Sequence, residues 1–253
     1  MENKYKTAEI AQMAGVHPNT VRLYEKCKLI PEAERQSNGY RVFTDLHIEQ
    51  FKLARTALKV EVLQNGLRKN AVEIIKVSAT KNFDAAIQLT DGYLSQIKEE
   101  QQNAEEAIEI VKHILSGEHD INTAEDIFLT RKQTAEHLQV TIDTLRNWEL
   151  NGLITVRRKK NGYRVYTGDD IMRLKIIRSL RCANYSLAAI LRMLAAASHN
   201  SDIDIREVID TPKQDDDIIS VCDKLLTSLQ EAEYNALEVM AQLKKMKKQF
   251  YTV

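Results

Sequence analysis

The chain of 253 residues is 43% hydrophobic and 28% charged, which is typical of an ordinary soluble protein with room for two compact units. No apolar run is long enough for a membrane span, the N-terminus lacks the apolar stretch of a signal peptide, and the three distant cysteines form no C-x-x-C pair. We therefore expect a cytoplasmic protein without a disulfide framework or a zinc site. The net charge is zero, but residues 125–196 hold 13 Lys/Arg against 7 Asp/Glu and residues 81–115 hold 3 against 7, so basic and acidic parts cancel.

Residues 6–28 are predicted to form two short helices joined by a turn. Gly15 accepts the positive φ that a chain reversal needs. Pro18 suits the first turn of the second helix, where its missing N–H costs little. This order is typical of a helix-turn-helix.

A β-hairpin is predicted next, over residues 29–44, because Asn38-Gly39 marks a tight turn between two short strands. A two-stranded loop after a helix-turn-helix is a wing. A further helix is predicted over residues 45–58.

A long helix follows, with apolar positions that alternate in steps of four and three. This spacing predicts a coiled coil. The stripe consists of Phe83, Ile87, Thr90, Leu94, Ile97, Gln101, Ala104, Ile108, Val111 and Leu115.

The second half of the chain then repeats the first. VHPNTVRLYE at 16–25 matches VTIDTLRNWE at 140–149, and SNGYRVFT at 37–44 matches KNGYRVYT at 160–167. The offset is 124 residues for Arg22 and Arg146 but 123 for Arg41 and Arg164, so the second copy lacks one residue. In this copy Thr141 is the expected N-cap, and Asn161-Gly162 marks the hairpin turn.

The second copy continues with a helix at 168–183 and another that Ser186 is expected to cap. It ends in a second heptad stripe of the same length as the first, and we expect the two long helices to pair. This stripe consists of Ile218, Cys222, Leu225, Leu229, Ala232, Ala236, Val239, Leu243, Met246 and Phe250.

The predicted fold class is mainly α, with two winged helix-turn-helix domains, each with a small β-hairpin wing, joined by long coiled-coil helices. The predicted parts are a first winged domain at 1–78, a first coiled-coil helix at 81–116, a linker at 117–128, a second winged domain at 129–200 and a second coiled-coil helix at 213–251.

The two copies resemble the MerR family of bacterial transcription regulators. The resemblance rests on T-V-R-L-Y-E, N-G-Y-R-V-F, T-L-R-N-W-E, N-G-Y-R-V-Y and N-Y-S-L-A-A-I-L-R-M-L, and it covers roughly residues 1–75 and 129–197. Two features depart from the family. Leu23 and Asn147 replace the first of two adjacent aromatic residues, and the family normally has one such domain per chain.

The resemblance implies that double-stranded DNA is the partner, and that Arg22 and Arg146 contact its backbone. Short side chains in the first turn of each second helix are candidates for base contacts. These are His17, Asn19, Thr20, Thr141, Asp143 and Thr144. Candidates for phosphate contacts in the wings are Tyr40, Arg41, Arg157, Arg158, Lys159, Lys160, Tyr163 and Arg164.

For Tyr40 and Tyr163, packing is an equal alternative to a phosphate contact. Tyr24 and Trp148 are interpreted as core anchors, and Cys222 as a buried structural residue. No nucleophile–base motif or phosphate loop is present, so we expect neither an enzyme nor a cofactor or metal.

Family proteins dimerise through an antiparallel coiled coil and bend promoter DNA for RNA polymerase. The resemblance thus implies a transcriptional regulator, and equal stripes favour a monomeric pseudo-dimer over a homodimer. Two alternatives stay open. One is an architectural or recombination accessory DNA-binding protein, and the other is a regulator that binds a partner protein through its coiled coil.

Overall fold

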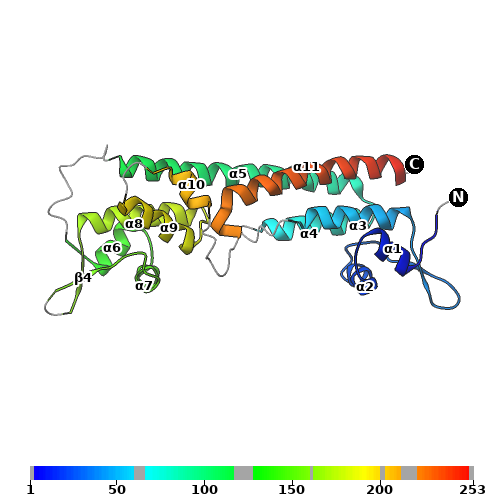
Figure 1. Ribbon diagram of the computed structural model, residues 1–253, viewed down its shortest axis with the longest axis horizontal. Coiled ribbons are helices and arrows are strands. Elements are labelled where there is room, and N and C mark those ends of the chain that lie inside the picture. Colours follow the sequence, from blue (N-terminus) through cyan, green and yellow to red (C-terminus); the bar gives the residue numbers. More distant parts are fainter. Residues whose placement is uncertain are drawn as a thin grey trace. The chain divides into compact units, whose positions relative to one another are not determined.

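The computed structural model describes residues 3–59, 66–116, 128–159, 162–199, 203–211 and 221–250. Helices dominate, and the strands form short antiparallel hairpins (Figure 1), so the predicted mainly α class is confirmed. The chain divides into two compact units, Met1–Glu99 with Leu229–Val253 (unit 1) and Glu100–Ser228 (unit 2). Among the described residues, no helix is both long enough and apolar enough to cross a membrane.

Unit 1 contains the first winged helix-turn-helix domain, which we call module 1. Gly15 lies in the helix-turn-helix turn with a φ of +63°, and Pro18 opens α2, as predicted. The wing pairs Glu34 with Val42 and Arg35 with Arg41. The elements of module 1 are α1 (Thr7–Met13), α2 (Pro18–Lys26), β1 (Glu34–Arg35), β2 (Arg41–Val42), α3 (Asp45–Ala57) and α4 (Leu67–Ala79).

The core of module 1 holds α2 against α3 and the wing. Val21 and Phe43 are fully buried, and the ring of Tyr24 stacks on that of Phe51 with 4.4 Å between centroids. Tyr24 is therefore a core anchor, as the sequence predicts. Because aromatic stacking adds to area burial, this contact stabilises the orientation of α2.

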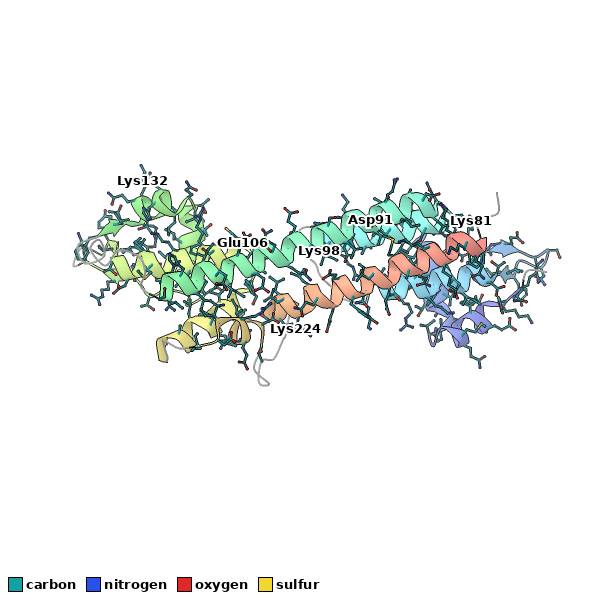
Figure 2. The ribbon with its side chains drawn as sticks, turned by 90° about the horizontal axis from the view of Figure 1, so that it is seen from above. Lys81, Asp91, Lys98, Glu106, Lys132 and Lys224 are labelled. Carbon is teal, nitrogen blue, oxygen red and sulfur yellow. The ribbon has the colours of Figure 1, made fainter. Side chains whose placement is uncertain are left out.

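Unit 1 also contains the first part of α5 (Phe83–Leu115) and most of α11 (Leu225–Phe250), which lie side by side (Figure 2). Their apolar faces form one cluster with α3 and α4. Asp84 forms an ion pair with Lys247, and Lys98 lies 4.0 Å from Glu233. The two ion pairs are 14 residues apart in each helix, and the residue number rises along α5 while it falls along α11. The two segments are therefore antiparallel and belong to one chain.

The polar residue Thr90 is accommodated in this seam without an unpaired hydroxyl. Thr90 is fully buried, and its Oγ1 donates to the carbonyl of Ala86 at 2.7 Å. Since the hydrogen bond is made inside α5, the apolar face of α11 need not supply a polar partner. The stripe residues Leu229, Val239, Leu243 and Met246 are buried, as predicted.

Unit 2 contains the second winged domain, which we call module 2. Gln139 has a positive φ of +52° at the position where module 1 has Gly15. Thr141 and Ser186 cap their helices as predicted. The elements are β3 (Leu129–Thr130), α6 (Arg131–Leu138), α7 (Ile142–Leu150), β4 (Arg157–Arg158), β5 (Arg164–Tyr166), α8 (Gly168–Cys182) and α9 (Leu187–His199).

Module 2 has a three-stranded sheet in the order β3-β5-β4 instead of a two-stranded wing. The added strand pairs Leu129 with Tyr166. Module 1 has only a single bridge at the matching place, between Tyr5 and Phe43. The third strand was not predicted from the sequence.

Each of the two long helices differs from its prediction in one feature. The stripe was expected from Ile218, which lies outside the described residues, but the α-helix begins at Leu225, after the 3₁₀ helix η2 (Val221–Lys224). At the end of α5 the burial also differs, because Ile114 is buried and Leu115 is exposed. The side chain of Cys222 lies outside the described residues, and Cys27 and Cys182 are exposed free thiols.

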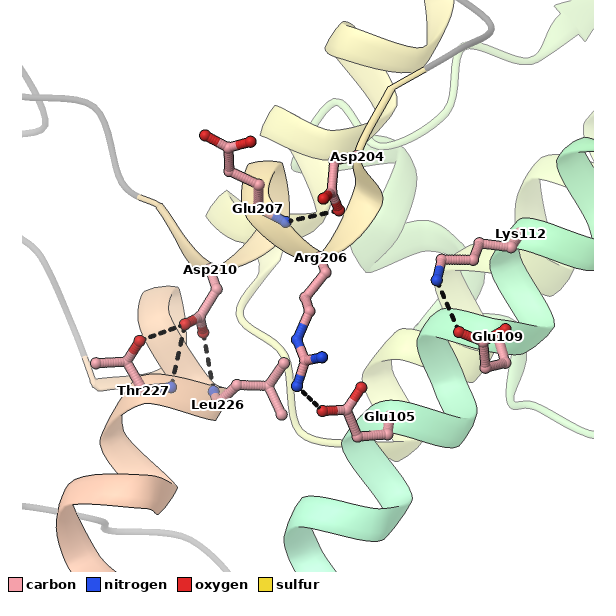
Figure 3. Close-up of polar contacts among 9 residues, drawn as sticks. All are labelled: Glu105, Glu109, Lys112, Asp204, Arg206, Glu207, Asp210, Leu226 and Thr227. Atoms are coloured by element: carbon pink, nitrogen blue, oxygen red, sulfur yellow. Dashed lines mark hydrogen bonds and ion pairs between the residues drawn. The ribbon is translucent and has the colours of Figure 1, made fainter.

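The unpredicted helix α10 (Ile205–Asp210) connects module 2 to both long helices inside unit 2 (Figure 3). Asp210 accepts hydrogen bonds from the backbone N–H groups of Leu226 and Thr227, at 2.8 and 3.1 Å, at the start of α11. Arg206 forms an ion pair with Glu105 of α5. The carboxylate of Asp210 thus satisfies N–H groups that the first turn of α11 leaves free.

Candidate nucleic-acid interface

Helix α2 of module 1 presents one face to solvent. Val21 is fully buried, whereas Asn19, Arg22, Leu23 and Lys26 are exposed at the spacing of a single helical face. His17 caps the helix, since its Nδ1 accepts from the backbone N–H of Asn19 at 3.2 Å. Arg22 donates to Oδ1 of Asn19 at 2.9 Å.

The candidate base-contact residues of module 1 are therefore at the exposed start of α2. His17 and Asn19 are exposed, and Thr20 is half-buried. The first turn also places the phosphate-contact candidate Arg22 beside Asn19.

Helix α7 of module 2 repeats this arrangement with different side chains. Oγ1 of Thr141 accepts from the N–H of Thr144 at 3.0 Å, and the two hydroxyls lie 2.8 Å apart. Asp143 and Arg146 are exposed, and Trp148 is buried, which confirms its interpretation as a core anchor. The exposed faces of α2 and α7 thus differ in their chemistry at matching positions.

The wings expose one tyrosine each. Tyr40 is 71% exposed and Tyr163 is 73% exposed. Of the two alternatives for these residues, packing in the core is excluded by this exposure.

A contact that the sequence analysis missed joins each wing to its second helix. Nε of Arg41 donates to Glu25 at 2.6 Å, and Glu25 also accepts from the backbone N–H of Ala33 at 3.2 Å. In module 2, Nε of Arg164 donates to both carboxylate oxygens of Glu149, at 2.6 and 2.9 Å. Charge-assisted bonds of this length are strong, so each glutamate fixes its wing against the helix.

The sequence did carry a signal for this contact. The glutamate recurs in both copies directly after Tyr24 or Trp148, and the arginine recurs in both wings. A repeated acid and a repeated base of opposite charge are a candidate ion pair.

The two glutamates have unequal surroundings. Glu149 also lies 3.4 Å from Arg131 and 3.9 Å from Arg158, so three arginines share one carboxylate. The basic run of the second wing adds to this charge, because Arg157, Arg158 and Lys159 are exposed; Lys160 lies outside the described residues.

An open groove lies on one side of each wing. The groove of module 1 runs between the end of α2, the wing and the end of α4, and its basic lining residues are Arg22, Lys26, Lys28, Arg35, Arg41 and Lys76. The groove of module 2 runs between the wing and the starts of α6 and α7, and its basic lining residues are Arg131, Lys132, Lys159 and Arg164.

A second missed contact holds the segment that follows α2 or α7 against the helix after the wing, α3 or α8. Nε2 of Gln50 donates to the carbonyls of Leu29 and Ile75, at 3.1 and 2.9 Å. At the matching position of module 2, Nε of Arg173 donates to the carbonyl of Leu153 at 2.6 Å. Burial lowers the pKa of the Arg173 guanidinium from its ordinary value.

The described residues contain no group of three or more His, Cys, Asp or Glu side chains placed to hold a metal ion.

Two helix-turn-helix motifs, each followed by a wing, define a tandem winged helix-turn-helix protein. Comparison with protein families gives the same division: residues 129–197 match the MerR HTH family regulatory protein, and residues 6–43 match the MerR family regulatory protein. The chain is therefore a member of the MerR family with two such domains in tandem.

Three curated relatives illustrate the similarity. The mercuric resistance operon regulatory protein of Bacillus cereus is 30% identical over 66 residues, 26% of this chain and 50% of the relative. The HTH-type transcriptional regulator ZntR of Escherichia coli K12 is 31% identical over 65 residues, 26% of this chain and 46% of the relative. The HTH-type transcriptional regulator CueR of Yersinia pestis is 38% identical over 53 residues, 21% of this chain and 38% of the relative.

The chain thus spans half or less of the length of these relatives. No solved structure matches the chain.

Proposed function

We propose that this protein is a transcriptional regulator that binds double-stranded DNA, and that each module reads one half-site. The observation that carries the proposal is the recurrence of one geometry in two modules. Each has a second helix with an exposed polar face, capped at its start and fixed through a glutamate to an arginine of the wing. A helix held beside a wing that carries an arginine suits a major groove flanked by phosphates.

Specific readout is assigned to the first turns of α2 and α7. His17 and Asn19 have donor and acceptor groups at the helix start, where side chains meet base edges. Thr141 and Asp143 hold the matching positions in module 2 but differ in shape and charge. The two half-sites are therefore expected to differ in sequence.

Backbone contacts are assigned to Arg22 and Arg146 and to the wings. The bond from Arg41 to Glu25 uses Nε, and an arginine has five N–H donors. The ion pair therefore leaves donors of Arg41 for a phosphate while it fixes the position of the guanidinium. The same argument applies to Arg164, whose bonds to Glu149 also use Nε.

We infer further that one chain acts as an intramolecular pseudo-dimer. The support is the antiparallel contact of α5 and α11 in unit 1, with ion pairs at Asp84–Lys247 and Lys98–Glu233. The apolar seam there includes Phe83, Leu243 and Met246, all fully buried. Full burial of a large apolar side chain contributes about 1.5–3 kcal/mol, so a chain that fills its own seam gains little from a second copy.

Selection of bound sequences from a random duplex library tests the proposal. We expect the enriched DNA to contain two different half-sites at a fixed separation, bound by one chain. Arg22→Ala and Arg146→Ala together serve as the control and should abolish enrichment. Enrichment of a single half-site, or none by the wild-type protein, would contradict the proposal.

If the protein regulates transcription, sites mapped in cells should fall within promoters, where bending of the DNA would realign promoter elements for RNA polymerase. Sites at the ends of mobile elements would instead favour the architectural or recombination role.

A further inference from the structure

The two grooves lie on different sides of the wing arginine. In module 1 the groove is bounded by the C-terminal end of α2 and by α4, whereas in module 2 it is bounded by the N-terminal ends of α6 and α7. Arg41 and Arg164, which hold matching positions, line both. We propose, on the basis of the function inferred above, that the two modules hold the DNA backbone from opposite sides of their wings.

Three of the four basic residues of the module 2 groove have neutral counterparts in module 1. Arg131 and Lys132 stand where module 1 has Thr7 and Ala8. Lys159 stands where module 1 has Gln36. Three cations on this side of the second wing are thus matched by three neutral residues beside the first wing.

The converse holds on the other side of the wing. Lys26 and Lys28 line the module 1 groove, whereas Leu150 and Gly152 stand at the matching positions of module 2. Lys76, from α4, adds a further cation to the same groove. Apart from Lys6, which stands where Thr130 lines the module 2 groove, the cations that differ between the two modules lie on opposite sides of their wings.

The positive charges of Arg131 and Lys132 are not explained by a contribution to the stability of α6. Both lie in the first turn of α6, where the helix dipole disfavours positive charge. Arg131 shares Glu149 with two other arginines, and Lys132 reaches only the exposed Glu136, at 3.9 Å. An exposed pair at that distance contributes little to folding. A phosphate in the groove would be a further partner for both cations.

Lys28 gives an independent indication in module 1. Its φ is +59°, in the left-handed region that favours glycine, and the matching residue Gly152 has a φ of +75°. Module 1 thus keeps a strained lysine where module 2 has an unstrained glycine. The backbone conformation at this position favours glycine, so it does not explain a lysine. The place of Lys28 in the lining of the basic groove does explain its charge.

The occupant assigned to both grooves is the phosphate backbone of duplex DNA, because their linings combine several cations with few acids. Counterion release makes the number of such contacts measurable. The slope of log Kobs against log salt concentration changes by about 0.9 for each phosphate that a protein neutralises on B-DNA.

The test is a salt titration of the full-length protein on a fluorescein-labelled duplex of random sequence. Lys28→Gly should lower the magnitude of the slope by about 0.9 while the melting temperature stays equal or rises, because the substitution relieves strain. Arg131→Ser with Lys132→Ser should lower it by about 1.8, for two contacts. Lys112→Ser with Lys224→Ser, in α5 and the 3₁₀ helix η2 of unit 2, removes the same charge outside the grooves and should leave the slope unchanged.

The outcomes separate this inference from the function on which it rests. If the wild-type protein shows no salt-dependent binding to duplex DNA, the proposed function fails. If the wild-type slope is steep but Lys28→Gly and the α6 double variant keep it, or if the control variant lowers it equally, the assignment of the grooves is overturned.

Discussion

Replacement of Glu149 by Gln tests whether the glutamate holds the wing of module 2 in place. The side chain of Glu149 is 18% exposed, and that of Arg164 is 23% exposed, so solvent screens the pair only in part. Hydrogen bonds to charged groups contribute about 1.5–3 kcal/mol to stability. The variant also leaves Arg131, Arg158 and Arg164 close together without their shared carboxylate. We expect the free energy of unfolding of module 2 to fall by about 1.5–3 kcal/mol.

Trp148 is the natural probe for this experiment. It is the single tryptophan of the chain, it is buried, and it directly precedes Glu149. Its fluorescence during urea unfolding therefore reports on module 2, and an unchanged m-value would show that the variant altered stability alone. A double-mutant cycle with Arg164→Gln isolates the pairwise contribution.

Glu136→Gln is the matched control, because Glu136 is an exposed acid of the same module that lies 3.9 Å from Lys132. Its effect should stay below about 1 kcal/mol, the upper range for exposed pairs. The reasoning is wrong if the two glutamine variants unfold at the same urea concentration.

Three further predictions concern the core and the interface. Leu243→Ala should destabilise unit 1 by about 2–5 kcal/mol in a urea titration, because Leu243 is fully buried in the seam; a loss below 1 kcal/mol would contradict that packing. Tyr185→Phe should leave stability at neutral pH unchanged or raised, because its buried hydroxyl has no hydrogen-bond partner among the described residues. Burial raises the pKa of Tyr185 above its ordinary value, so the folded state keeps this phenol protonated to higher pH than the unfolded state does; stability should fall as pH rises past about 10, and less steeply in Tyr185→Phe. Arg146→Ala should weaken binding to all duplex sequences alike and reduce the salt slope, and a change in base preference at constant slope would refute its backbone role.

The sequence alone predicts the local elements of both modules well. The conformational effects of Gly15, Pro18 and Thr141 are limited to neighbouring residues. The turn, the first helical position and the N-cap can therefore be identified from single residues. The heptad stripes likewise predict the buried face of α5 and α11, because burial in a paired helix depends on periodicity.

Contacts between distant residues were harder to predict. Gln50 bonds to carbonyls 21 and 25 residues away, and no periodic pattern marks a side chain that serves backbone acceptors. Heptad spacing also continues through Cys222, which lies in the 3₁₀ helix η2, so the predicted second helix begins before Leu225. The carboxylate of Asp210 accepts from the first N–H groups of α11, and this cap comes from another helix.

The pairing of Glu25 with Arg41 is an intermediate case. The two residues are 16 positions apart, but the repeat preserves both charges, and a comparison of the two copies identifies the pair. Internal repeats can therefore reveal tertiary contacts when each copy keeps both partners.

The central claim is that α5 and α11 of one chain pair with each other. Cross-linking with a short bismaleimide tests it most directly, in a variant without native cysteines that carries Asp84→Cys and Lys247→Cys. Asp84→Cys with Glu233→Cys is the control, because the latter site lies 14 helical residues away, about 21 Å along α11. An equal mixture of isotopically light and heavy protein separates cross-links within a chain from those between chains. The account predicts cross-linked peptides that are entirely light or entirely heavy, in the first variant only; cross-links of mixed mass, in a stable dimer by light scattering, would contradict it.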